Sequence, residues 1–106
     1  MPVETIHDPG AVSQAIAEST DKPVVIHFWA TWLGPVSPVL PVLQEAEEQT
    51  GQTVKVIYTD SPFIPAPHSP NDIPLTLVFK FGQEVRKAES ASHEEITSLV
   101  LNAKFF

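Results

Sequence analysis

One short stretch of this sequence, residues 31–38, raises the question of chemistry, and it reads TWLGPVSP. A tryptophan, a Gly-Pro turn and the start of a predicted helix give it the outline of a reactive loop, but the side chains of Leu33 and Val36 cannot act as nucleophiles. Ser37 could do so only with a base within hydrogen-bond reach. His27 is the only local candidate for that base, and we expect it to lie below the surface rather than beside Ser37.

Cysteine chemistry is excluded for this chain. The sequence contains no cysteine, so it can form no disulfide, no thiolate metal site and no redox-active dithiol. The histidines show no i,i+4 or similar spacing of the kind that places two imidazoles on one metal ion. We therefore expect neither a metal site nor a cofactor.

Two histidines admit a chemical hypothesis. His27 stands in a predicted interior strand, where burial lowers the pKa of an imidazole and keeps it neutral near pH 7. It could be a general base or pH sensor below the loop, or a neutral core histidine bonded to a hydroxyl or water, which is the commoner case. His68 stands in a proline-rich segment, where it could contact a ligand or, more commonly, be a solvated loop residue.

A strand and a helix must position the 31–38 stretch. Residues 23–31 are β-branched, aromatic and almost continuously apolar, which predicts a central strand covered on both faces. Residues 36–50 show helical spacing of Val36, Val39, Leu40 and Leu43. Pro41 is predicted to kink this helix, and Gly51 to end it.

The remaining elements complete an α/β pattern. Asp8 and Pro9 predict an N-cap and the first residue of a helix, and Ser92 opens a capping box for the last helix. Strands are predicted at 53–60, 75–81 and 84–89, with a tight turn at Gly82-Gln83 and an ordered loop at 61–72. A helix between the first two strands makes them parallel. We expect one domain, 1–106, with a mixed sheet and helices on both faces.

Composition limits the class of partner. At 106 residues with 42% apolar content, the chain is long enough for one core. Its formal charge of −7 would be repelled by a nucleic-acid duplex or an anionic membrane. No apolar run reaches the ~18 residues that span a bilayer, and residues 1–10 show no secretory signal. We expect a cytoplasmic protein with a protein or small-molecule partner.

The order of elements and five motifs resemble the thioredoxin family along nearly the whole chain. KPVVIHFWATW, residues 22–32, is similar to the strand that leads into the family's active site. WLGPV, residues 32–36, stands where the family has Trp-Cys-Gly-Pro-Cys. The other matches are Pro41 for the helix-kinking proline, Ile73-Pro74 for the cis-proline that faces the active site, and LVFKFGQEV at 77–85 for the closing hairpin. The resemblance implies a thioredoxin fold with a cis-proline at Pro74.

The departures from the family pattern concern its chemistry. Leu33 and Val36 occupy the positions of the two cysteines, and His27 that of the buried acidic proton acceptor. Ser37 replaces the usual basic residue. Leu75 stands where the family usually has Thr after the cis-proline, and Glu89 where a glycine is expected. Without either sulfur, dithiol–disulfide exchange by this chain is excluded.

The resemblance implies a function based on shape. Thioredoxins dock partners on the corresponding surface, so we expect noncovalent binding of a protein or an extended peptide, with the backbone of Ile73 adding a strand. The predicted binding residues are Trp32, Leu33, Gly34, Pro35, Val36, His68, Ile73 and Pro74. One alternative is a non-redox enzyme with His27 or His68 as acid/base and helix N–H groups near Gly34–Val36 holding an oxyanion. Another is a decayed or cysteine-free relative of a thiol-disulfide oxidoreductase. A homo-oligomer, formed through the apolar tip Phe105-Phe106, also stays open.

Overall fold

The computed structural model describes residues 3–51, 53–61, 64–65, 67–89 and 92–106. Residues 62–63 and 66 of the predicted 61–72 loop lie outside this part of the chain. Within it, none of the helices has the length and apolar character that crossing a membrane requires.

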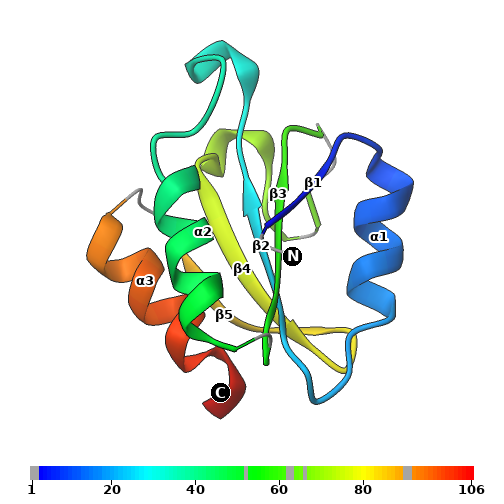
Figure 1. Cartoon of the computed structure of the whole chain (residues 1–106). Helices are drawn as coiled ribbons and strands as arrows, with labels where there is room; N and C mark the ends of the chain where they lie inside the picture. The colour runs from blue at the N-terminus through cyan, green and yellow to red at the C-terminus, as the bar shows by residue number, and fades with distance from the viewer. Residues whose placement is uncertain (1–2, 52, 62–63, 66, 90–91) are drawn as a thin grey trace.

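A five-stranded mixed sheet forms the centre of the molecule, in the order β1-β3-β2-β4-β5 (Figure 1). The strands are β1 (Glu4–Ile6), β2 (Val24–Phe28), β3 (Lys55–Thr59), β4 (Leu75–Lys80) and β5 (Gln83–Ala88). The predicted parallel pairing of β2 with β3 and the antiparallel hairpin of β4 with β5 are both confirmed. β2 also pairs with β4, antiparallel, so it lies in the middle of the sheet.

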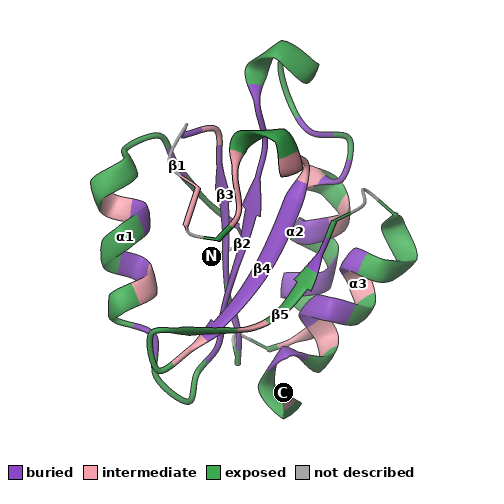
Figure 2. Cartoon of the chain, turned by 180° about the vertical axis from the view of Figure 1, so that it is seen from behind, coloured by how far each residue is buried: buried purple, intermediate pink, exposed green. Residues whose placement is uncertain are grey.

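Helices cover both faces of the sheet, as predicted (Figure 1). α1 (Pro9–Ala17) packs on one face, where Val12 and Ala15 join one apolar cluster. α2 (Leu40–Gln49) and α3 (His93–Asn102) cover the other face and share a second cluster. Every residue of β2 is buried between these two clusters. In Figure 2, β2 and most of β4 are accordingly coloured as buried.

The strand β1 was not predicted. It is only three residues long and pairs in parallel with β3 at the edge of the sheet, with Ile6 opposite Thr59. So short a segment cannot show the alternation that identifies a strand in a sequence. Its pairing with a strand some fifty residues away defines it as a strand, which its local sequence does not.

The predicted start of the second helix was wrong, and so was the kink at Pro41. α2 begins at Leu40, which places Pro41 in the first helical turn. The N–H groups of a first turn have no acceptor within the helix, so a proline there removes no bond and causes no kink. Val36 and Val39 precede the helix, although their spacing looked helical.

The hairpin turn lies one residue earlier than predicted. Lys80 pairs with Gln83, so Phe81 and Gly82 form the two-residue turn. Both have positive φ, 52° and 77°. Two-residue turns of this kind favour Asn-Gly or Gly-Gly, because a residue with a Cβ is strained there. Phe81 is therefore an unusual residue for its position.

Candidate functional site

The 31–38 stretch lies at one end of the sheet, where three strands meet. Phe28, the last residue of β2, pairs with Thr59 at the end of β3 and with Leu75 at the start of β4. The chain therefore leaves β2 for the loop beside the point where it enters β4. In Figure 1 this loop rises above the sheet, and the short helix η2 (Pro70–Asp72) lies at the same end.

Ile73 and Pro74 connect η2 to β4 at this end. The peptide bond between them is cis, and both residues are half-buried. Ser69 caps η2 through a capping box with Asp72, whose carboxylate accepts a hydrogen bond from the Ser69 N–H at 2.9 Å. The segment before Pro74 is thus a capped turn rather than a free coil.

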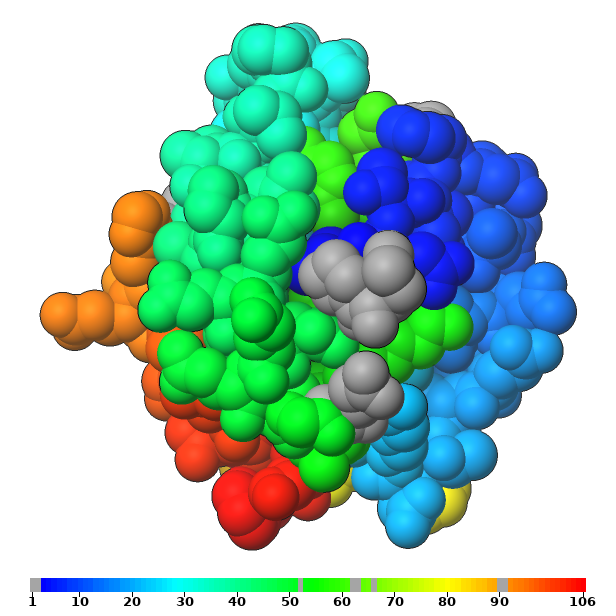
Figure 3. Space-filling model, in the orientation of Figure 1, coloured from blue at the N-terminus to red at the C-terminus, as the bar shows by residue number. Residues whose placement is uncertain are grey.

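The loop presents an apolar surface to solvent. Trp32 and Leu33 belong to the 3-10 helix η1 (Thr31–Leu33), and their exposed fractions are 70% and 45%. Val36, three residues beyond η1, is 50% exposed. Pro35 is exposed as well, and Gly34 is half-buried. Figure 2 colours the outer part of this loop as exposed, and Figure 3 shows it as a knob above the sheet.

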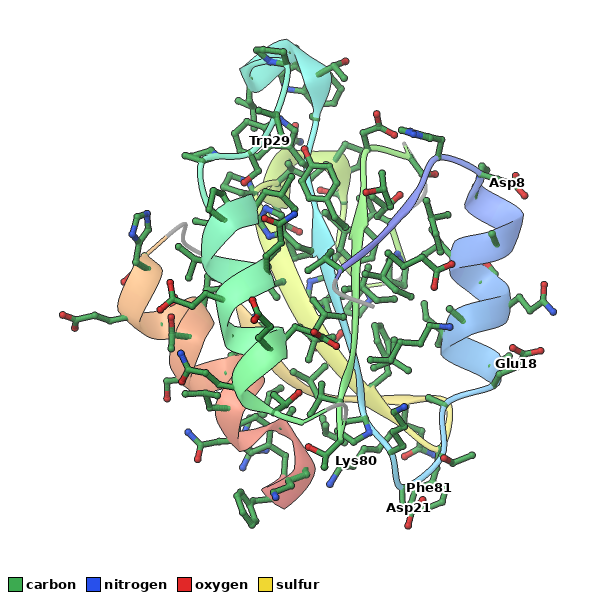
Figure 4. The ribbon with its side chains drawn as sticks, in the orientation of Figure 1. Asp8, Glu18, Asp21, Trp29, Lys80 and Phe81 are labelled. Carbon is green, nitrogen blue, oxygen red and sulfur yellow. The ribbon has the colours of Figure 1, made fainter. Side chains whose placement is uncertain are left out.

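Gly34 lets the loop turn back towards the core. Its φ of 145° lies in the region that residues with a side chain rarely adopt. Its carbonyl oxygen accepts a hydrogen bond, at 3.0 Å, from the indole Nε1–H of Trp29. Trp29 is itself buried and lies directly below the loop (Figure 4). A hydrogen bond to a buried indole thus attaches the loop to the core.

A chain of polar side chains is buried beneath the loop. His27 lies between Thr76 of β4 and Tyr58 of β3, its direct partners on the two neighbouring strands. Its Nδ1 is 2.8 Å from the Thr76 hydroxyl oxygen, and its Nε2 is 2.9 Å from the Ser37 hydroxyl oxygen. The rings of Tyr58 and Trp29 stack near the imidazole, with centroids 5.8 and 6.4 Å away. Both ring nitrogens are therefore satisfied in the interior.

Ser37 joins this chain to the loop backbone. Its N–H donates to the Tyr58 hydroxyl at 3.1 Å, and its own hydroxyl oxygen accepts from the N–H of Val39 at 3.2 Å. The residue is 1% exposed. Our expectation that His27 would not lie beside Ser37 was wrong, because the loop folds inward at this one residue.

Burial sets the protonation state of His27. Desolvation lowers the pKa of this imidazole from its ordinary value of 6.5 to about 4. The ring is therefore neutral at pH 7, and one of its nitrogens donates while the other accepts. Since the hydroxyls of Thr76 and Ser37 rotate, they serve either tautomer. Of the two hypotheses, a neutral core histidine bonded to hydroxyls fits these contacts.

His68 lies away from the loop and is not solvated. Its side chain is 8% exposed, and its Nε2 is 2.7 Å from a carboxylate oxygen of Glu84 on β5. Glu84 pairs with Phe79, near the far end of β4 from Pro74. Asp72 is a second, more distant neighbour, at 4.0 Å from Nδ1. His68 thus fastens the proline-rich segment to the edge hairpin.

The enzyme alternative lacks one part that it requires. Since α2 begins at Leu40, no helix N-terminus lies at Gly34–Val36 to hold an oxyanion. Among the residues that the structure describes, no three His, Asp or Glu side chains gather as metal ligands. The arrangement at this end of the sheet offers apolar surface supported by buried hydrogen bonds.

The sequence did not indicate Thr76, Tyr58 or Trp29 as parts of the site. Strand alternation could have placed Trp29 on the same face as His27, since the two are separated by one residue. Thr76 and Tyr58 depend on register, which a single sequence does not reveal.

Comparison with known proteins assigns both family and fold. The family described as Thioredoxin matches residues 5–102. A thioredoxin from Porphyra purpurea is 32% identical over 105 residues, which cover 96% of each chain. The crystal structure of a Malassezia sympodialis thioredoxin superimposes with a TM-score of 0.72 at 24% identity, covering 98% of this chain and 95% of that one. Thioredoxin NaTrxh from Nicotiana alata gives 0.72 at 21% identity, with 96% and 92% covered. The thioredoxin fold implied by the sequence is confirmed.

Proposed function

The chain belongs to the thioredoxin family, and from that premise we propose that it is a redox-inactive member that binds a protein or an extended peptide noncovalently. The proposed docking surface consists of Trp32, Leu33, Val36, Ile73 and Pro74. Gly34 and Pro35 shape the loop between its members. His68, held against Glu84, is left out of it.

The observation that carries the proposal is the character of the two family cysteine positions. Leu33 and Val36 are hydrocarbon side chains, and yet about half of each is exposed. Together with Trp32 they make an apolar surface at the end of the sheet. Clustered exposed apolar side chains on a soluble protein mark interaction sites more often than isolated ones do. Tryptophan is one of the residue types that most often dominate binding energy at interfaces.

The class of partner follows from charge and shape. A net charge of −7 disfavours nucleic acid and anionic membranes. Ile73, at the same end of the sheet as the loop, is in extended backbone conformation, which suits the addition of a peptide strand. We accordingly propose an extended polypeptide segment as ligand. We also propose the cytoplasm as the compartment. The competing occupant of the surface is a second copy of this chain. The molar mass across a concentration series, measured by light scattering, separates the two.

Peptide display on the immobilised protein tests the binding proposal. We expect enrichment of extended peptides with apolar side chains, and at least tenfold weaker binding by Trp32→Ala or Leu33→Asp, about 1.4 kcal/mol or more. Phe81→Ala is the matched control, because Phe81 is as exposed as Trp32, 69% against 70%, but lies at the opposite end of the sheet. Equal binding by Leu33→Asp and the parent would refute the docking surface.

Disulfide reduction tests the other half of the proposal. With insulin as substrate and dithiothreitol as reductant, we expect the rate with the protein to equal the rate without it. Turnover above that background would overturn redox inactivity.

A further inference from the structure

The loop between Ala30 and Val39 has little internal structure to hold its shape. η1 contributes two backbone bonds, from Leu33 N–H to Ala30 O at 2.9 Å and from Gly34 N–H to Thr31 O at 3.2 Å. Pro35 and Pro38 have no N–H to donate. An exposed segment of this kind fluctuates unless the rest of the protein fixes it.

Two attachments to the sheet fix it. The first is the Trp29 indole bond to the Gly34 carbonyl. The second is Ser37, whose N–H and hydroxyl engage Tyr58 and His27. These attachments lie on the two sides of Pro35 and Val36, so the segment between them is held at both ends.

Ser37 is buried and makes several hydrogen bonds to the rest of the protein. It is the only buried residue between Thr31 and Pro38, and a serine offers one donor and two acceptor sites on its hydroxyl. Val39 N–H uses one acceptor, and His27 Nε2 meets either the donor or the remaining acceptor. Thr76 holds the other ring nitrogen, so the imidazole cannot turn away without leaving a buried polar group unpaired.

We propose that His27 and Ser37 are positioning residues for the docking surface: their hydrogen bond holds the loop so that Trp32, Leu33 and Val36 are presented in one arrangement before a peptide arrives. The inference rests on the proposed function. Fixing a loop beforehand removes the cost of ordering its side chains from binding. The pair thus strengthens binding without touching the ligand.

Loop dynamics test the attachment without any ligand. We expect ¹⁵N order parameters of Trp32, Leu33, Gly34 and Val36 to fall from about 0.85 to below about 0.6 in Ser37→Ala. His27→Leu should give the same pattern. The matched control is Ser19→Ala, because the buried Ser19 hydroxyl accepts from Gly82 N–H at 2.8 Å and so attaches the hairpin turn at the other end. That variant should loosen the hairpin turn and leave the loop unchanged.

Binding tests the consequence. With a peptide obtained by display on the parent protein, Ser37→Ala should bind about tenfold more weakly, while Ser19→Ala binds as the parent does. Unchanged order parameters in Ser37→Ala would overturn the attachment, and unchanged affinity despite a loosened loop would overturn its role in binding. If display yields no peptide, the proposed function fails while the relaxation experiment still decides the attachment.

A third measurement tests the alternative that Ser37 is a nucleophile. Attack on an acyl or phosphonyl group needs the Ser37 hydroxyl to leave its buried bonds and meet a reagent. We expect no labelling of Ser37 by a fluorophosphonate probe, detected by mass spectrometry of the intact protein. Stoichiometric labelling that His27→Leu abolishes would overturn the positioning role in favour of catalysis.

Discussion

Trp32 and Phe81 are exposed at opposite ends of the sheet, and these two aromatic side chains differ in what lies beneath them. At one end Trp32 belongs to the loop that Ser37 joins to the buried side chains of His27, Thr76 and Tyr58. At the other end Phe81 occupies a two-residue turn with positive φ, which Figure 4 shows beside Lys80. Exposure alone does not separate a functional surface from a turn. The proposed docking surface is distinguished from the turn by the hydrogen-bonded side chains beneath its loop.

The turn at Phe81 is fastened by simpler means. Its backbone N–H donates to Thr20 O at 3.2 Å, and the N–H of Gly82 donates to the Ser19 hydroxyl. One side chain thus fixes the turn, where a connected set of side chains from three strands fixes the loop. This difference predicts where substitutions are costly.

The largest expected effect is at His27. His27→Leu should lower the free energy of unfolding by about 3 kcal/mol, because the buried hydroxyls of Thr76 and Ser37 lose their hydrogen bonds to the imidazole. Phe81→Leu, at the other end, should change it by less than about 0.5 kcal/mol. Urea denaturation measures both.

A second substitution identifies the cause of that loss. Adding Thr76→Val to His27→Leu should recover about 1 kcal/mol, since removing both partners leaves no orphaned hydroxyl on β4. No recovery would mean that the lost ring packing, and not the hydrogen bonds, explains the effect of His27→Leu.

The next effect is a pH dependence that arises from His27, beneath the loop. Because burial lowers the pKa of His27 from 6.5 to about 4, the unfolded chain takes up a proton first as the pH falls. The stability from a neutral His27 is complete above pH 6.5 and lost progressively towards pH 4. Between pH 7.5 and 5 the loss should be about 2 kcal/mol.

The control for the pH experiment is the double variant His27→Leu/Thr76→Val. It keeps every other titratable group, so the difference between its curve and that of the parent isolates His27. Parallel curves from pH 7.5 to 5 would show that His27 titrates alike in the folded and unfolded chains.

A smaller effect, of opposite sign, is expected at the hairpin turn. Phe81→Asn should raise the free energy of unfolding by about 1 kcal/mol, because asparagine tolerates positive φ better than phenylalanine. A loss of stability instead would show that the exposed ring contributes packing that outweighs its backbone strain. Thermal unfolding followed by circular dichroism is sufficient to decide.

The smallest effect is at Trp32 itself. Trp32→Ala should change stability by less than about 0.5 kcal/mol, as substitutions of exposed side chains usually do, while weakening peptide binding at least tenfold. A stability loss above about 1 kcal/mol would mean that the indole belongs to the fold. The comparison between the two ends would then lose its functional meaning.

Sequence patterns gave the framework and missed the connections. The buried strand at Val24–Phe28 and the helix at His93–Asn102 were recognisable from local spacing and capping. β1 and the start of α2 were missed, because a non-local pairing defines the first and prolines displace the second. The His27–Ser37 bond was missed because the inward fold of the loop depends on the positive φ of Gly34 and on the Trp29 indole. Both features depend on tertiary structure, which local sequence patterns do not show.

The two tryptophans are close together in sequence, but one is buried in the protein and the other is exposed to water. Trp29 is 6% exposed and bonded to the loop, whereas Trp32 is 70% exposed. Indole fluorescence shifts to longer wavelength as water surrounds the ring, so we expect the emission of this chain to have a blue component from Trp29 and a red component from Trp32. A ligand that covers Trp32 moves only the red one. The molecule therefore carries an optical signal of occupancy together with its own internal reference.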